Sequence, residues 1–416
     1  MTIADTHDSG RYAAFRHRSF AFYWLARFLS AFGMQMIAVA VGWQIYDLTR
    51  NPFDLGIIGL VQFLPALLLI LVTGAAADRF GRRMIMGLCE VVSILAAAAL
   101  IALTVRGLTS PLPVFAVLLV FGIVRAFFAP ASTSLAPNLV PEKDLANAVA
   151  WNSMSWQVAT IVGPVAGGLL YGLGDAVPYT TSLVFFGIAS ILIFVIPKPP
   201  QKRGVRNQSW ETLSAGFRYI WRQKVVLGAI SLDMFAVLLG GAVALLPVFA
   251  RDVLELGPWG LGLLRAGPGI GAVAMAVYLA AHPFRNHAGA TMFVAVGIFG
   301  LATAVFGASK IAWLSIVALI VMGAADMISV YVRQTLIQLW TPDELRGRVS
   351  AVNMVFIGAS NELGEFRAGS MAALIGAVPA VIVGGVGAVG IAALWAALFP
   401  GLRRIQRLER VEHAER

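Results

Sequence analysis

The sequence predicts an all-α membrane protein of twelve spanning helices, arranged as two pseudo-symmetric six-helix bundles. The 416 residues are 59% hydrophobic and only 12% charged, whereas a soluble domain carries roughly 25% charged residues. Apolar runs of about 20 residues, the length of a bilayer crossing, recur along the whole chain. These runs lack the alternation of membrane β-strands, and backbone groups in lipid need internal partners, so we expect helices.

Each apolar run is justified by its length and by the polar turn that follows it. The first run follows the Arg-bearing stretch RYAAFRHRSF with no small-residue cleavage site, so we expect a retained helix and not a signal peptide. The twelve runs are, in order and approximately, 20–46, 54–77, 84–105, 112–136, 148–172, 178–196, 225–250, 258–281, 289–307, 311–336, 349–375 and 378–400. The even number of spans places both termini on one side.

Charge patterning divides and orients the chain. The polar segment PKPPQKRGVRNQSW separates the first six spans from the last six. Most of the 31 Lys and Arg lie in the tails and alternate loops on the side of the termini, which predicts that both termini are cytoplasmic. The expected location is a bacterial inner membrane. The expected divisions are a tail at 1–19, a bundle at 20–196, a central loop at 197–224, a bundle at 225–400 and a basic tail at 401–416.

No metal, cofactor or enzyme motif is predicted. Cys89 is the only cysteine, and the five histidines show no ligand spacing. The sequence has no nucleophile elbow, no zinc-protease helix and no phosphate-binding loop. We therefore expect no enzyme and no nucleic-acid partner. The expected partners are a small-molecule substrate and the lipid bilayer. We expect a monomer that is driven by an ion gradient, and we expect the ion to be the proton.

The two halves of the chain resemble each other. Identities at one nearly constant offset join corresponding spans: Gly122 with Gly323, Leu135 with Leu336, Pro141 with Pro342, Gly163 with Gly364 and Gly168 with Gly369. Near the start of each half, Pro52, Leu55 and Gly56 match Pro258, Leu261 and Gly262. A duplicated six-helix unit is typical of secondary transporters, which bind substrate near the membrane midplane between two repeats.

The loop between the second and third spans reads GAAADRFGRR and resembles the signature loop G-x-x-x-D-R-x-G-R-R of the major facilitator superfamily. The resemblance in plan covers nearly the whole chain. It implies a latch that holds the cytoplasmic side shut, with Asp78 facing the start of span eleven. The latch residues are Gly74, Asp78, Arg79, Gly81, Arg82 and Arg83. The alternative is that the arginines only fix topology. The matching loop of the second half, AAHPFRNHAG, keeps only Arg285, so the latch is expected on one side.

Span five carries GPVAGG, which is similar to the G-P-x-x-G-G motif of exporting, antiporting branches of the superfamily. Its members here are Gly163, Pro164, Gly167 and Gly168, although Ala159 stands where a further glycine is usual. The alternative is a bend that only allows tight packing. The strings SNELGEFRAG in span eleven and LARFLS in span one resemble the branch that contains bacterial siderophore exporters of the enterobactin type and related drug efflux proteins.

Ionisable residues inside apolar spans cost about 2.5 to 3.5 kcal/mol each on insertion scales, so we expect them to face partners or a watery cavity. The candidates for proton coupling or for lining the cavity are Arg27, Arg125, Asp233, Asp326, Glu362, Glu365 and Arg367. Arg125 and Asp326 occupy equivalent positions and are expected to form a couple. Static ion pairing is the alternative for each acid.

Three further charged residues, Glu90, Arg265 and Arg333, are expected closer to span ends, where long side chains reach the interface, and no function is assigned to them.

The function that follows is secondary active transport by alternating access. We expect a proton-coupled exporter of a small amphipathic molecule, such as a siderophore or a drug. The nearest alternative is a proton-coupled importer. A membrane receptor without transport is a further alternative, although the chain offers no large soluble domain.

Overall fold

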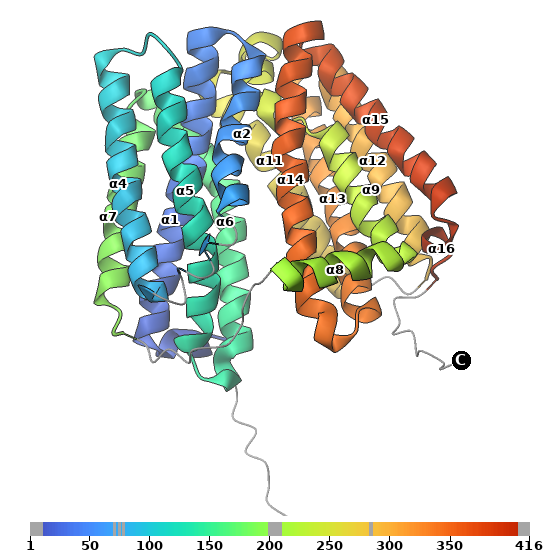
Figure 1. The fold of residues 1–416 in the computed structure, drawn as a ribbon. Helices are drawn as coiled ribbons and strands as arrows, with labels where there is room; N and C mark the ends of the chain where they lie inside the picture. The colour runs from blue at the N-terminus through green and yellow to red at the C-terminus, as the bar shows by residue number, and fades with distance from the viewer. Residues whose placement is uncertain are drawn as a thin grey trace, which may run out of the picture.

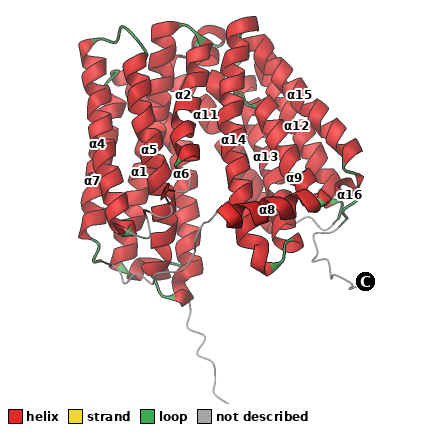
Figure 2. Cartoon of the chain, in the orientation of Figure 1, coloured by secondary structure: helices red, strands yellow, loops and turns green. Residues whose placement is uncertain are grey.

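The computed structural model describes residues 11–69, 72–73, 76, 80–198, 210–282 and 286–406. Every regular element in these residues is a helix (Figure 1, Figure 2), so the predicted all-α class is confirmed. Four residues named above, Gly74, Asp78, Arg79 and Arg285, lie outside the described residues.

Six long helices form the N-terminal bundle. They are α1 (Arg18–Thr49), α2 (Pro52–Leu68), α4 (Arg82–Arg106), α5 (Leu112–Leu135), α6 (Leu145–Leu173) and α7 (Val177–Val195). Short 3₁₀ turns precede or join them at Ala13–Arg16, Ala136–Asn138 and Glu142–Asp144. The turn into α2 shows why these boundaries arise: the side chain of Asn51 accepts a hydrogen bond from the backbone N–H of Phe53 (3.1 Å), and Pro52 is tolerated at the first helical position.

The C-terminal bundle repeats this plan. Its long helices are α9 (Lys224–Gly240), α11 (Gly257–Ala281), α12 (Ala288–Ala308), α13 (Ala312–Trp340), α14 (Asp343–Ile375) and α15 (Ala377–Leu398). The seventh span continues beyond α9 through a 3₁₀ turn η4 (Val243–Leu245), α10 (Leu246–Val248) and a π turn η5 (Phe249–Val253). Two surface helices, α8 (Trp210–Arg222) and α16 (Pro400–Arg403), flank the bundle.

The helices account for the twelve predicted spans. Among the described residues, ten helical segments are long and apolar enough to cross a membrane. The described part of α2 is a shorter apolar helix of 17 residues. Helix α14 is 33 residues long, but its polar and charged residues keep its hydropathy below that of the other spans.

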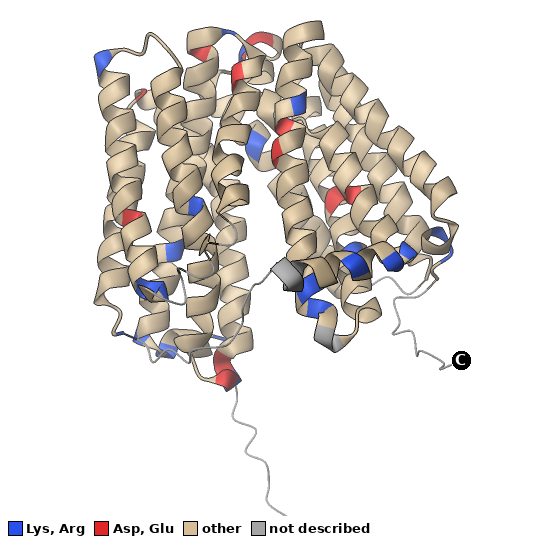
Figure 3. Cartoon of the chain, in the orientation of Figure 1, with Lys and Arg blue, Asp and Glu red and all other residues tan. Residues whose placement is uncertain are grey.

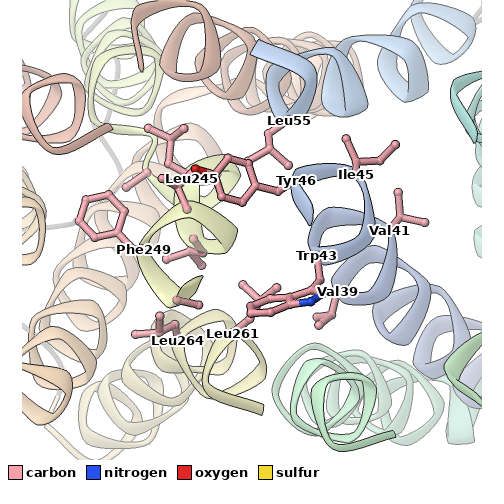
Figure 4. Close-up of a cluster of buried hydrophobic side chains, with 14 of the residues drawn as sticks. Val39, Val41, Trp43, Ile45, Tyr46, Leu55, Leu245, Phe249, Leu261 and Leu264 are labelled. Carbon is pink, nitrogen blue, oxygen red and sulfur yellow. The ribbon is translucent and has the colours of Figure 1, made fainter. Parts of the chain in front are cut away.

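The two bundles share one apolar core on one side of the molecule only. We call one end of the molecule the terminal side: α1 begins there, and α8 and α16 lie there (Figure 1). The opposite end is the outer side. On the outer side a single cluster of buried side chains includes both bundles, with Trp43 of α1 facing Leu261 of α11 (Figure 4). On the terminal side each bundle has its own cluster, one around Tyr23 and the other around Val332. The seam between the bundles is therefore closed at the outer side by shared packing.

Candidate functional site

Glycines of α6 bring three helices together in the outer half. A Cβ atom added at Gly163 would lie 2.7 Å from the Cβ of Gln35, and one at Gly167 would lie 2.9 Å from the Cα of Met36, so both glycines fit against α1. Gly168 faces the other bundle, because its added Cβ would lie 2.4 Å from the carbonyl oxygen of Pro258. Only glycine allows backbones to approach this closely.

The contact between α6 and α11 also depends on a glycine of α11. A Cβ atom at Gly262 would lie 2.5 Å from the carbonyl oxygen of Pro164. The predicted span-five motif is thus placed on the seam between the two bundles. Its glycines and proline pack α6 against α1 and α11 at the same time.

A second seam joins α2 to α14. Gly56 and Gly369 pack backbone to backbone, since a Cβ at Gly369 would lie 2.7 Å from the amide nitrogen of Gly56. One turn further along α2, a Cβ at Gly59 would lie 3.0 Å from Oε2 of Glu362 and 3.1 Å from Oε2 of Glu365. The two acids of α14 therefore point at the N-terminal bundle, at the inner limit of the closed region.

Four charged residues from both bundles meet at this point, and we call them the seam quartet: Arg125, Arg265, Glu362 and Glu365. Arg125 of α5 donates to Oε1 of Glu362 (2.9 Å), which links the two bundles. Arg265 of α11 interacts electrostatically with both carboxylates. Figure 3 shows acidic and basic residues near one another in the outer half of the molecule, where α14 and α11 approach α2. Two positive and two negative charges balance in this cluster.

The pairing of Arg125 corrects one prediction. Arg125 was expected to form a couple with Asp326, its equivalent in the repeat, but its partner is Glu362. Asp326 instead lies inside the C-terminal bundle near Asp233 and Arg333. Positions that are equivalent in a repeat need not touch: Arg125 points across the seam to α14, whereas Asp326 points into its own bundle.

Asp233, Asp326 and Arg333 form a cluster that we call the bundle triad. Arg333 of α13 donates to Asp233 of α9, and both side chains are buried, with 3% and 6% exposure. Both acids also line a small cavity of about 10 Å³, close to the smallest volume that holds one water molecule. The buried hydroxyl of Ser329 lines this cavity and has no hydrogen-bond partner in the described part of the chain.

Two predicted residues have local structural contacts. Arg367 of α14 donates to the carbonyl oxygens of Leu238 (2.7 Å) and Leu239, which are free at the C-terminal end of α9. Arg27 of α1 lies beside Tyr23, whose hydroxyl donates to the carbonyl oxygen of Ser132 (2.9 Å). Arg367 therefore acts as a helix cap, and Arg27 lies near the contact between α1 and α5.

The expectation that Glu90, Arg265 and Arg333 reach the membrane interface is wrong. Glu90 is 1% exposed and Arg333 2% exposed, and Arg265 joins the seam quartet. Ser30 of α1 lies beside the carboxylate of Glu90. Among the described residues, however, no donor forms a hydrogen bond of good geometry with either carboxylate oxygen. Neighbouring helices enclose these side chains, which a count of residues from the span ends does not reveal.

The part of the signature loop that the structure describes is anchored within the N-terminal bundle. Gly81 has a φ of 86°, which favours glycine, and immediately precedes α4. Arg82 donates to the carbonyl oxygen of Ser134 (2.7 Å), and Arg83 donates to that of Ile196. The contact of Asp78 with span eleven stays a prediction.

The outer end carries crossed ion pairs that sequence reasoning missed. Arg50 at the end of α1 pairs with Asp252 of η5 (3.1 Å), and Arg251 of η5 pairs with Asp47 of α1. Tyr46 also donates its hydroxyl to Asp252. An acid and a base precede Pro52 in one half and Pro258 in the other, so the internal repeat was the signal that could have found them.

Comparisons with known proteins agree with this architecture. Residues 9–413 match the family described as Transmembrane secretion effector. The enterobactin exporter EntS of Citrobacter koseri is 26% identical over 409 residues, with 94% of each chain covered. The enterobactin exporter EntS of Escherichia coli O1:K1 is 26% identical over 411 residues, again with 94% of each chain covered.

Two solved structures have the same fold. One is a bacterial homologue of the human lysosomal transporter Spinster, in an inward-facing, unoccupied conformation, with a TM-score of 0.73, 15% identity and coverage of 93% of this chain and 97% of that one. The other is the nucleoside transporter NupG, with a TM-score of 0.66, 13% identity and coverage of 92% and 99%. The family match covers nearly the whole chain, and the two bundles of long helices agree with it. The chain therefore belongs to the Transmembrane secretion effector family of major facilitator superfamily transporters.

Proposed function

We propose that this transporter is a proton-coupled exporter of a small amphipathic molecule, such as a siderophore or a drug. The observation that carries the proposal is the one-sided seam: a shared core joins the bundles on the outer side, and separate cores divide them on the terminal side. Substrate then enters from the terminal side, and rocking of the bundles releases it on the other side.

The direction of transport is supported by the span-five motif. Its Pro164 and Gly168 lie on the seam against α11, while Gly163 and Gly167 pack against α1, and the curated relatives are named enterobactin exporters. We place the terminal side in the cytoplasm of a bacterial cell, at the inner membrane, because Arg82, Arg83, Arg218, Arg222, Arg346, Arg348, Arg403 and Arg404 all belong to that side. We take the working unit to be a monomer.

Proton coupling is supported by a charge balance. The seam quartet has two guanidinium and two carboxylate groups and needs no further ion. The bundle triad has two carboxylates and one guanidinium, so one negative charge is left without a partner. An unpaired carboxylate in a buried site is neutralised by a proton in preference to remaining charged. Asp326, which forms no ion pair within the described part of the chain, is the best placed proton carrier, and transport needs no cofactor beyond the proton gradient.

The substrate contacts follow from the exposed charge at the open side of the seam. The side chain of Arg125 is 56% exposed even though it bonds Glu362. An anionic amphipathic molecule offers oxygen acceptors to such a guanidinium.

Transport in proteoliposomes tests this function. We would reconstitute the protein, impose a pH gradient, and follow enterobactin and the dye ethidium together with an internal pH indicator. An exporter moves a probe against the direction in which protons flow. Movement in the same direction as protons would establish an importer, and binding without movement of any probe would favour a receptor.

A further inference from the structure

A large groove lies on the terminal side, away from the seam. It is bounded by α8 and α14 and has a volume of about 840 Å³. Phe217 and Trp221 of α8 form one wall, and Val352, Val355 and Phe356 of α14 form the other. Phe217 stacks on Trp221 with ring centres 6.1 Å apart. The groove thus presents an apolar interior at the surface of the C-terminal bundle.

Helix α8 is held firmly on one face, so its other face is available. A Cβ atom at Gly216 would lie 2.8 Å from the carbonyl oxygen of Arg348, which requires close backbone packing on α14. Tyr219 donates its hydroxyl to the carbonyl oxygen of Trp340, and Ile220 is buried. On the open face, Trp221 is 67% exposed. An exposed aromatic side chain on an amphipathic helix beside membrane spans is typical of a helix that lies in the lipid interface.

Two cations border the apolar groove. Arg218 and Arg222 are one turn apart and therefore share a face of α8. Both line the groove, and neither forms an ion pair or a side-chain hydrogen bond within the described ranges of the chain. Figure 3 shows basic residues along α8, which crosses the terminal side of the bundle. Guanidinium groups without partners at this depth match the phosphate of a lipid headgroup.

We propose that this groove binds one anionic phospholipid from the leaflet on the terminal side. The phosphate lies between Arg218 and Arg222, and an acyl chain lies along Phe217, Val355 and Phe356. Two features select this occupant over a soluble peptide or the transported substrate. The groove is bounded by no residue of the N-terminal bundle, so it is separate from the seam. Its apolar walls and paired cations match the two parts of an anionic lipid.

Native mass spectrometry with added lipid tests the proposal. The full-length protein in detergent would be titrated with phosphatidylglycerol and, separately, with phosphatidylcholine. The test variant is the double substitution Arg218→Gln and Arg222→Gln. The matched control is Arg403→Gln and Arg404→Gln in and beside α16, which removes two exposed charges from the same side but outside the groove. A third variant, Val355→Trp, fills the apolar interior and leaves the charge unchanged.

The expected result is one retained phosphatidylglycerol molecule on the wild-type protein and weaker retention of phosphatidylcholine. The α8 double variant is expected to lose about tenfold or more in affinity for phosphatidylglycerol. Val355→Trp is expected to weaken binding as well, and the control pair is expected to bind like the wild type. Equal losses in the α8 and control variants would mean delocalised attraction and overturn the proposal. Unchanged binding in both groove variants, or equal retention of the two lipids, would also overturn it.

Discussion

The outer and terminal halves of this transporter are built differently from the same twelve helices. In the outer half, Gly168 and Gly262 allow α6 and α11 to touch through their backbones, and one apolar core spans both bundles. In the terminal half, each bundle keeps a core of its own. The comparison teaches that closure of the seam depends on small residues and short-range packing, with ion pairs added at the rim.

The position of the seam quartet sharpens this contrast. Glu362 and Glu365 of α14 lie opposite Gly59 of α2, where the tight packing of the outer half ends. A charged pair between Arg125 and Glu362 therefore stands at the limit between the closed and the divided regions. If the bundles rock as we propose, we expect the two partners to separate, which would make this pair responsive to substrate or protons.

The largest expected effect comes from filling the outer seam. Gly168→Leu introduces a side chain whose Cβ would lie 2.4 Å from a backbone oxygen of Pro258. Overpacking of this kind costs about 1 to 3 kcal/mol, which shifts the equilibrium away from the closed outer seam by roughly fivefold to 150-fold. Transport in proteoliposomes is expected to fall by at least about fivefold. Accessibility of an introduced cysteine on the outer side, in a Cys89→Ser background, is expected to rise.

The matched control is Gly172→Leu on the same helix, where an added Cβ meets nothing within 4 Å. This variant is expected to transport at a rate close to that of the wild type. Equal impairment of the two variants would show that glycine flexibility, and not seam contact, is what α6 requires.

The second effect concerns the cross-bundle pair. Glu362→Gln is expected to slow transport strongly, because it leaves Arg125 and Arg265 facing a single carboxylate. The charge swap Arg125→Glu with Glu362→Arg is expected to recover part of the lost rate if direct pairing matters. Rates of the two single variants and of the swap, compared as a double-mutant cycle, measure the coupling. Additive losses with no recovery would contradict a functional pair.

The third effect separates proton coupling from substrate movement. Asp326→Asn removes the charge that the triad leaves unbalanced, so substrate exchange is expected to continue while the response to an imposed pH gradient is lost. Enterobactin exchange and gradient-driven enterobactin transport in the same proteoliposomes measure the two properties. Glu365→Gln in the balanced quartet is the comparison variant, and it is expected to keep a pH response. A pH response that survives in Asp326→Asn would refute this assignment.

The smallest effect is expected at the rim. Asp252→Asn removes the partner of Arg50 and Tyr46, but exposed ion pairs contribute only about 0.2 to 1 kcal/mol. We expect the outer side to open a few times more often, measured as faster labelling of an introduced cysteine on the outer side in a Cys89→Ser background. Glu255→Gln, a neighbouring exposed acid that forms no ion pair in the part of the chain described, is the control. Identical labelling rates in both variants would show that the ion pairs at the outer end do not help to keep the outer side closed.

Much of the fold was predictable because it depends on composition and period. The apolar runs, the basic central segment and the repeated glycines predict twelve helices in two bundles, and the structure has this architecture. The contacts between bundles were less predictable, since they depend on tertiary geometry. Arg125 pairs with Glu362 across the seam. No spacing along the chain indicates that partner.

Burial depth was the weaker part of the sequence analysis. Arg333 was expected near a span end and is buried against Asp233. Its helix α13 is 29 residues long, more than the roughly 20 that cross a bilayer. A position counted from the end of the apolar run therefore does not give its depth. Crossed pairs such as Asp47 with Arg251 also escape a search within the predicted spans, because both residues lie just beyond the ends of the apolar runs.

The most direct test of the account is a pair of distance distributions from spin labels in the Cys89→Ser background. One pair, on Val149 of α6 and Met354 of α14, reports the terminal side, and the other, on Leu112 of α5 and Leu374 of α14, reports the outer side. All four residues are exposed. Alternating access predicts that enterobactin or a change of pH shifts the two distances in opposite directions. Two distances that stay constant, or that lengthen together, would contradict it.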